Sequence, residues 1–232
     1  MIELRPDEPI LKLQKPLAVT WYATGDDTAA RAALAALPAS MAGDRSVLIY
    51  RLAFALIDRD WPQAENLIEK LKGGDDDGFF AYGEASVPVG CYSILLARFE
   101  QKSSDTTAGF AEIREQLNRK VQNAPRSAFL LSQLAVVDAL LKNKEAAVAE
   151  AKHAVELSRI AKDELQGPLL ELNLAVVYTW TNELDLAFEK LSSLTTVPNG
   201  IFYGQLKSDV YWEPLRHDPR YEQLLAQLAP KD

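Results

Sequence analysis

Apolar residues recur along most of the chain at intervals of three and four, which is the spacing of one face of an α-helix. Phe110, Ile113, Leu117 and Val121 are an example. Stretches rich in Gly, Pro, Asn and Asp interrupt this pattern and mark where helices end. The pattern predicts helices at 8–24, 28–38, 45–58, 62–72, 84–101, 106–123, 127–141, 144–161, 166–181, 184–194, 201–206 and 219–228.

The helices belong to repeated units that are marked by alanines. Ala30 and Ala64 are 34 residues apart, and large apolar residues follow each of them at four and seven positions. Ala147 and Ala187 begin the same pattern 40 residues apart, although alanines follow Ala147 at those positions. The 83 residues from Ala64 to Ala147 leave room for two units, so one further and less regular unit lies between them.

Each alanine has a physical role in the expected helix pairs. Two antiparallel helices approach within about 8–10 Å only where the facing side chains are small. A second alanine stands twelve positions before three of the marker alanines. These pairs are Ala18 with Ala30, Ala135 with Ala147, and Ala175 with Ala187. In the unit of Ala64 that position holds Leu52, with Ala53 beside it.

This pattern resembles the tetratricopeptide repeat (TPR) family. Two groups of residues stand at the family's spacing: Leu17, Ala18, Trp21 and Ala30, and Leu174, Ala175, Tyr178 and Ala187. The resemblance runs from about residue 12 to 197, and Asp138 departs from it because the family has an aromatic residue there. It implies an all-α fold, a TPR-like right-handed superhelix of about five helical hairpins.

The C-terminal residues 209–221 resemble the closing segment of bacterial TPR arrays that are attached to signalling and regulatory proteins. We therefore expect one domain, with the repeat array at 1–200 and a capping segment at 201–232. Asp218 is suited to cap a helix that begins with Pro219. Tyr211 and Trp212 would then cover the open end of the last hairpin. The resemblance also implies a larger parent protein, and it leaves a cytoplasmic or a periplasmic location open.

Composition limits the possible partners. Hydrophobic residues make up 48% of the 232 positions and charged residues 25%, as in ordinary globular proteins. No apolar run approaches the length of about 18 residues that a membrane-spanning helix needs. The net charge of −8 argues against nucleic-acid binding and favours partners with basic segments.

The chain lacks a recognisable catalytic or metal-binding motif. His153 and His217 have no nucleophile or carboxylate at a motif spacing, and Cys91 is a lone cysteine in an apolar helix. The acidic run at 73–78 lacks the alternating ligands of a calcium loop and is interpreted as a solvated loop. We therefore predict no enzyme activity, no cofactor and no metal.

The leading hypothesis is a non-catalytic protein–protein interaction scaffold that binds a peptide or helix, or a second copy, in its concave groove. In the TPR family, the first helix of each hairpin lines this groove. Its residues would be Val19, Tyr22, Leu56, Val136, Leu140, Val176 and Trp180, and each could equally be a core residue. A second hypothesis is a sensor domain for small ligands such as peptides or glycans. Its pocket would be formed by the apolar helix at 84–101.

Overall fold

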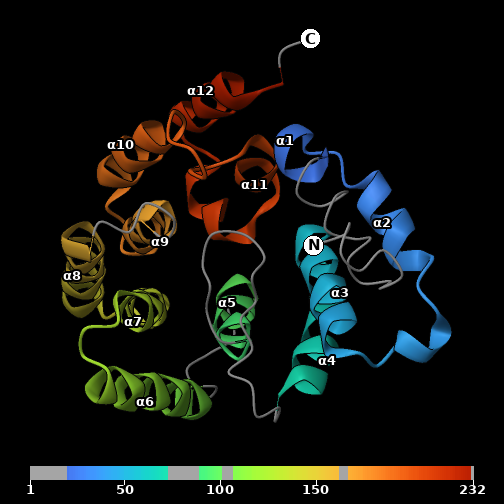
Figure 1. Ribbon diagram of the computed structural model, residues 1–232, viewed down its shortest axis with the longest axis horizontal. Coiled ribbons are helices and arrows are strands. Elements are labelled where there is room, and N and C mark those ends of the chain that lie inside the picture. The colour runs from blue at the N-terminus through green and yellow to red at the C-terminus, as the bar shows by residue number, and fades with distance from the viewer. Residues whose placement is uncertain (1–19, 73–88, 101–106, 162–166, 231–232) are drawn as a thin grey trace.

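The computed structural model describes residues 20–72, 89–100, 107–161 and 167–230, and every regular element within these ranges is helical (Figure 1). The prediction of an all-α protein is thus confirmed. The helices are α1 (Tyr22–Thr24), α2 (Thr28–Ala35), η3 (Ala39–Met41), α3 (Arg45–Ile57), α4 (Trp61–Leu71), α5 (Cys91–Phe99), α6 (Thr107–Asn123), α7 (Ala128–Leu140), α8 (Lys144–Ala161), α9 (Gly167–Trp180), α10 (Leu184–Leu194), α11 (Tyr203–Ser208), η5 (Val210–Leu215) and α12 (Pro219–Leu228).

Most predicted helices agree with these bounds to within a residue or two at either end. The helix expected at 28–38 ends at Ala35, and Pro38 has an extended backbone with a short 3₁₀ turn after it. A proline disfavours helical geometry in the residue before it, and the apolar spacing of Leu34 and Leu37 concealed this effect. The described part of the helix expected at 84–101 begins at Cys91.

The C-terminal region differs more from expectation. The helix predicted at 201–206 spans Tyr203–Ser208, and the unpredicted 3₁₀ helix η5 follows it. The Asp209 side chain accepts a hydrogen bond from the Tyr211 N–H and so starts the new helix. Asp218 caps α12 with Pro219 at its first turn, as the sequence predicted. Residues 8–19 of the helix expected at 8–24 and residues 84–88 of the helix expected at 84–101 lie outside the described residues.

Three helix pairs are joined by the same turn. Arg59, Lys142 and Asn182 each have a positive φ, at 56°, 68° and 62°. The N–H of the residue after each donates to the carbonyl five positions earlier, at 2.8–2.9 Å. This geometry is a Schellman-type helix end. It reverses the chain in three residues, so α3–α4, α7–α8 and α9–α10 form tight hairpins.

The marker alanines follow these turns at a constant distance. Ala64, Ala147 and Ala187 each stand five positions after the positive-φ residue, and Ala30 stands five positions after Gly25, whose φ is 70°. All four alanine side chains are fully buried. The alanines twelve positions before two of them, Ala135 and Ala175, are also fully buried, and so are Leu52 and the adjacent Ala53 in the unit of Ala64. Ala18 lies outside the described residues. Buried alanines therefore stand at both predicted positions in the hairpins α7–α8 and α9–α10, whereas the α3–α4 hairpin has Leu52 at one of them.

The helices from α5 to α10 follow one another along an arc (Figure 1). In this view α5, α7 and α9 lie on the inner side, and α6, α8 and α10 lie on the outer side. The inner helices α7 and α9 contact each other, and α8 contacts α9. Consecutive hairpins thus pack side by side, as in a helical array.

The C-terminal segment connects α1 to the last hairpin, α9–α10. Helix α11 lies near the centre of the molecule beside α1, η5 packs on α9, and α12 packs on both α10 and α11 (Figure 1). A Cβ atom at Gly204 would stand only 1.9 Å from the Trp21 carbonyl oxygen. Glycine therefore permits the close contact between α11 and the N-terminal region, and the segment does more than cover the last hairpin.

We predict that Ala147→Leu lowers the free energy of unfolding by about 1–3 kcal/mol, because the larger side chain has no space in the α7–α8 contact. Ala149→Leu is the matched control, since Ala149 is exposed on the same helix. Urea unfolding followed by circular dichroism measures both variants. Equal stability of the two variants would contradict the role of Ala147 in the helix contact.

Candidate functional site

The residues predicted to line the concave groove are mostly buried by the chain itself. Leu56 lies on α3, Val136 and Leu140 on α7, and Val176 on α9, with exposed fractions of 0–4%. Tyr22 and Trp180 are half-buried, and Val19 lies outside the described residues. The structure places four of these residues on the neighbouring inner helices α7 and α9, namely Val136, Leu140, Val176 and Trp180.

Trp180 is enclosed by groups from α5 and η5. Its indole N–H donates to the Tyr211 carbonyl at 2.9 Å, and the Phe99 ring meets it edge-on with centroids 5.9 Å apart. The Arg98 guanidinium lies 4.9 Å from the Trp180 ring centroid and also donates to the Leu140 carbonyl at 3.0 Å. Both the face and the polar edge of this indole are therefore used within the chain.

Tyr22 makes a similar contact at the opposite end of the array. Its ring stacks on Phe202, just before α11, with centroids 6.0 Å apart. Together, the contacts of Tyr22 and Trp180 hold the C-terminal segment against α1 and α9. The role of these two aromatic residues as partner contacts stays a prediction.

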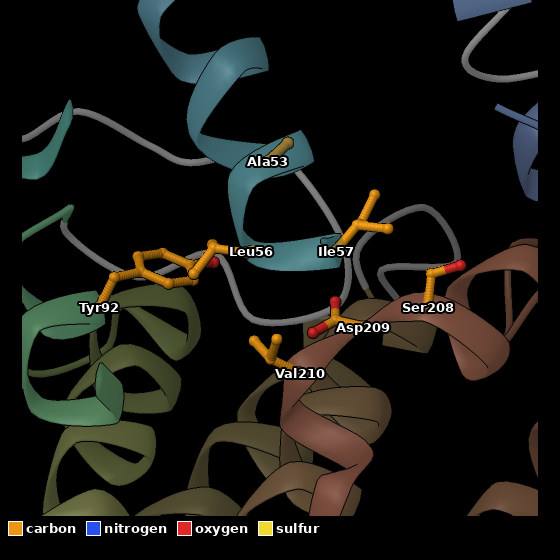
Figure 2. Close-up of a pocket in the computed structure, with 7 residues that line it drawn as sticks. All are labelled: Ala53, Leu56, Ile57, Tyr92, Ser208, Asp209 and Val210. Carbon is orange, nitrogen blue, oxygen red and sulfur yellow. The ribbon is translucent and has the colours of Figure 1, made fainter. Parts of the chain in front are cut away.

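A small cavity lies where α3, α5 and the C-terminal segment meet. Figure 2 shows the side chains of Leu56, Tyr92 and Val210 converging there, with Asp209 at its edge. Its volume is about 10 Å³, which corresponds to a single water molecule. A peptide or glycan needs several hundred Å³, so this cavity does not serve the sensor hypothesis.

Arg59 ties the α3–α4 turn to the C-terminal segment. Its guanidinium donates to the Ser208 carbonyl at 3.1 Å and to the Glu213 carboxylate at 2.9 Å. Arg216 shares the same Glu213 oxygen at 3.0 Å. One residue therefore shapes a hairpin turn through its backbone and anchors a segment about 150 positions away through its side chain.

A larger cleft lies along α8, α9 and α10 and has a volume of about 340 Å³. In Figure 1, α8 and α10 stand on the outer side of the arc with α9 set inward between them. Apolar and charged side chains from all three helices line the cleft. They are Lys152, Val155, Arg159, Leu174, Tyr178, Leu186, Glu189, Lys190 and Ser193. We define this set as the α8–α10 cleft.

An ion network joins the three helices beside this cleft. The Glu171 carboxylate of α9 accepts from Arg159 of α8 at 2.7 Å and from Lys190 of α10 at 2.5 Å. Burial favours the neutral form of Glu171, but the hydrogen bonds from Lys190 and Arg159 outweigh it and hold its pKa below the usual value. A second ion pair, Lys144 with Glu183, links the starts of α8 and α10.

A buried polar cluster lies between α6, α7 and α8. Asp138 has no exposed surface and pairs with Arg114 through both carboxylate oxygens, at 2.5 and 2.9 Å. Asn143 in the following turn donates to it at 2.6 Å. Asp138 thus links α6 to the α7–α8 turn. The sequence alone contained no signal for its pairing with Arg114.

Glu150 adjoins this cluster on α8. Burial and the nearby negative charge of Asp138 raise the pKa of Glu150 to about 7, although the positive charge of Arg114 opposes the shift. When protonated, Glu150 can donate a hydrogen bond to Asp138, which also raises its pKa. The side chain is consequently neutral at mildly acidic pH, when an ordinary glutamate is charged.

The remaining candidate reactive groups do not come together. Cys91 is fully buried, and burial raises the pKa of its thiol well above the usual value. His153 and His217 are exposed on different elements. Within the described ranges, no group of three or more His, Cys, Asp or Glu side chains could hold a metal ion. The acidic run at 73–78 lies outside the described residues. No described helix is long and apolar enough to cross a membrane.

No protein-family model matches the chain, and no curated protein or solved structure matches it either. The repeat and the surfaces described above therefore carry the functional argument. Among these surfaces, the α8–α10 cleft was not foreseen from the sequence. The convergence of Arg159 and Lys190 on Glu171 depends on the packing of three helices and has no local sequence signal.

We predict that the stability of the protein falls as the pH rises from about 4.5 to 7, to the extent that Glu150 contributes. The folded state holds this proton up to about pH 7, whereas the unfolded chain releases it near pH 4.5. Glu150→Gln mimics the protonated side chain. It should therefore raise the free energy of unfolding at pH 8 by about 1–2 kcal/mol and leave it nearly unchanged at pH 4.

Glu156→Gln on the exposed side of the same helix is the matched control. Urea unfolding of the wild type and both variants at pH 4, 6 and 8 isolates the contribution of Glu150. An equal pH dependence in the wild type and in Glu150→Gln would contradict a shared proton in the Asp138 cluster.

Proposed function

We propose that this chain is a non-catalytic protein–protein interaction scaffold, built as a TPR-like right-handed superhelix of about five helical hairpins. The repeated turn supports a repeat architecture. Four positive-φ residues each precede a buried alanine by five positions, although the residues themselves are Gly, Arg, Lys and Asn. A backbone feature that recurs with different side chains is typical of structural repeats.

The α8–α10 cleft is the observation that carries the functional proposal. It is a hollow of about 340 Å³ between helices that are held together by the Glu171 network. Leu186 borders it with 38% of its surface exposed, and apolar side chains from α8 and α9 continue the surface inward. A groove between rigid helices with an apolar floor is a common docking site for a segment of another protein.

We assign the partner to this outer cleft, and not to the inner groove positions. Leu56, Val136 and Val176 contact their own chain and present almost no surface. Binding at Leu56 or along α9 would require removal of the C-terminal segment, which lies beside Leu56 and packs on α9. The Tyr211 and Trp212 side chains of that segment are fully buried. The loss of that burial would cost several kcal/mol. The outer cleft requires no such rearrangement.

Site-specific photo-crosslinking in cells of the source organism tests this function. A photoreactive amino acid replaces Leu186 in one variant and Val197 in the other. The two side chains are similarly exposed, at 38% and 41%, but only Leu186 lines the cleft. We expect a discrete protein adduct at position 186 and none at position 197, as measured by gel shift and mass spectrometry.

The mass of the adduct distinguishes the alternatives. An increase equal to the chain's own 25.7 kDa would identify self-association through the cleft. An adduct of only a few hundred daltons would favour the sensor of small ligands and contradict the scaffold. Equal labelling at both positions, or no adduct at either, would also count against the proposed function.

A further inference from the structure

We infer that the α8–α10 cleft binds an acidic segment of a partner protein, in which a large apolar side chain is flanked by carboxylates. This inference rests on the proposed function and specifies the chemistry of the partner at the same cleft. It differs from the preference for basic partners that the net charge of −8 suggests, because the local charges of the cleft have the opposite sign.

The apolar part of the cleft accounts for the apolar anchor. Leu174 and Tyr178 lie one turn apart on α9, with exposed fractions of 4% and 6%. Val155 of α8 and Leu186 of α10 flank them from either side. A leucine or aromatic side chain that enters between these residues would bury apolar surface at about 25 cal/mol per Å².

The spacing of the lining residues shows the length of segment that fits. Lys152, Val155 and Arg159 form a stripe along α8 at intervals of three and four residues. Leu186, Lys190 and Ser193 form a similar stripe along α10. Each stripe covers seven residue steps, or about 10 Å along a helix axis. This length accommodates three or four residues of an extended peptide, or two turns of a helix.

The charges around the cleft favour carboxylates in that segment. Arg159 and Lys190 share the single carboxylate of Glu171, so their combined positive charge is only half neutralised within the network. Lys152 has no ion pair among the described residues and is exposed. Glu189 also lines the cleft and opposes these cations in part. The charge of Glu183 also acts on Tyr178, and Glu183 is paired with Lys144. Four cations therefore oppose three carboxylates in and beside the cleft, on an otherwise acidic protein.

Lys152 is the residue best suited to test this inference. Arg159 and Lys190 support Glu171, and replacing either would disturb the packing of α8 and α10 as well as the charge of the cleft. Lys152→Glu reverses one charge at the cleft and breaks no described ion pair. Lys70→Glu makes the same change in net charge at an exposed position on α4, so it serves as the matched control.

The probe is a displayed library of random 12-residue peptides, selected on the immobilised wild-type chain. We expect enriched peptides to carry Leu, Phe, Tyr or Trp next to Asp or Glu. Fluorescence anisotropy on one enriched peptide should then show at least tenfold weaker binding to Lys152→Glu, and unchanged binding to Lys70→Glu. Binding should also weaken as NaCl rises from 50 to 500 mM, since screening reduces exposed charge interactions.

Three outcomes would overturn the inference. They are enrichment of peptides that lack acidic residues, equal binding to the wild type and to Lys152→Glu, and no enrichment at all. Crosslinking at position 186 is independent of these results. A protein adduct there together with a failed selection would keep the scaffold function and reject the acidic partner. Failure of both experiments would reject the scaffold as well.

Discussion

Paired helices in this protein approach each other at alanines that lie just beyond a left-handed turn. The turn reverses the chain within three residues, and the alanine, five positions after the positive-φ residue, allows the two helices to pack closely. The arrangement of α3–α4, α7–α8 and α9–α10 depends on this combination. Because stacked hairpins expose their inner faces, a second set of contacts is required to cover them.

The C-terminal segment supplies those contacts. Trp180 of α9 binds the Tyr211 carbonyl, Arg59 binds Ser208 and Glu213, and Gly204 permits close contact with Trp21. The inner apolar surface of the array is thereby converted into core. The outer side between α8 and α10 has no equivalent covering segment among the described residues. Its cleft is consequently a surface that is accessible and has apolar side chains at its floor.

The sequence predicted the parts of the fold that local rules determine. Apolar periodicity placed α7, α8, α10 and α12 almost to the residue, because each has a continuous apolar face and clear turn residues. The position of α11 and the existence of η5 were missed. These short elements depend on the capping of Asp209 and on burial against α9, neither of which has a periodic signal.

The alanine spacing by itself determined that the chain forms helical pairs with small residues at their contacts. Tertiary structure alone decided which surfaces remain accessible. Trp180 stands on an inner helix as expected, yet the C-terminal segment reaches it through Tyr211, 31 residues away. Lys152 and Arg159 of α8 and Lys190 of α10 likewise line one cleft only because α9 packs between these two helices. Periodicity specifies which face of a helix is apolar, whereas the element that covers this face is specified by contacts distant in sequence.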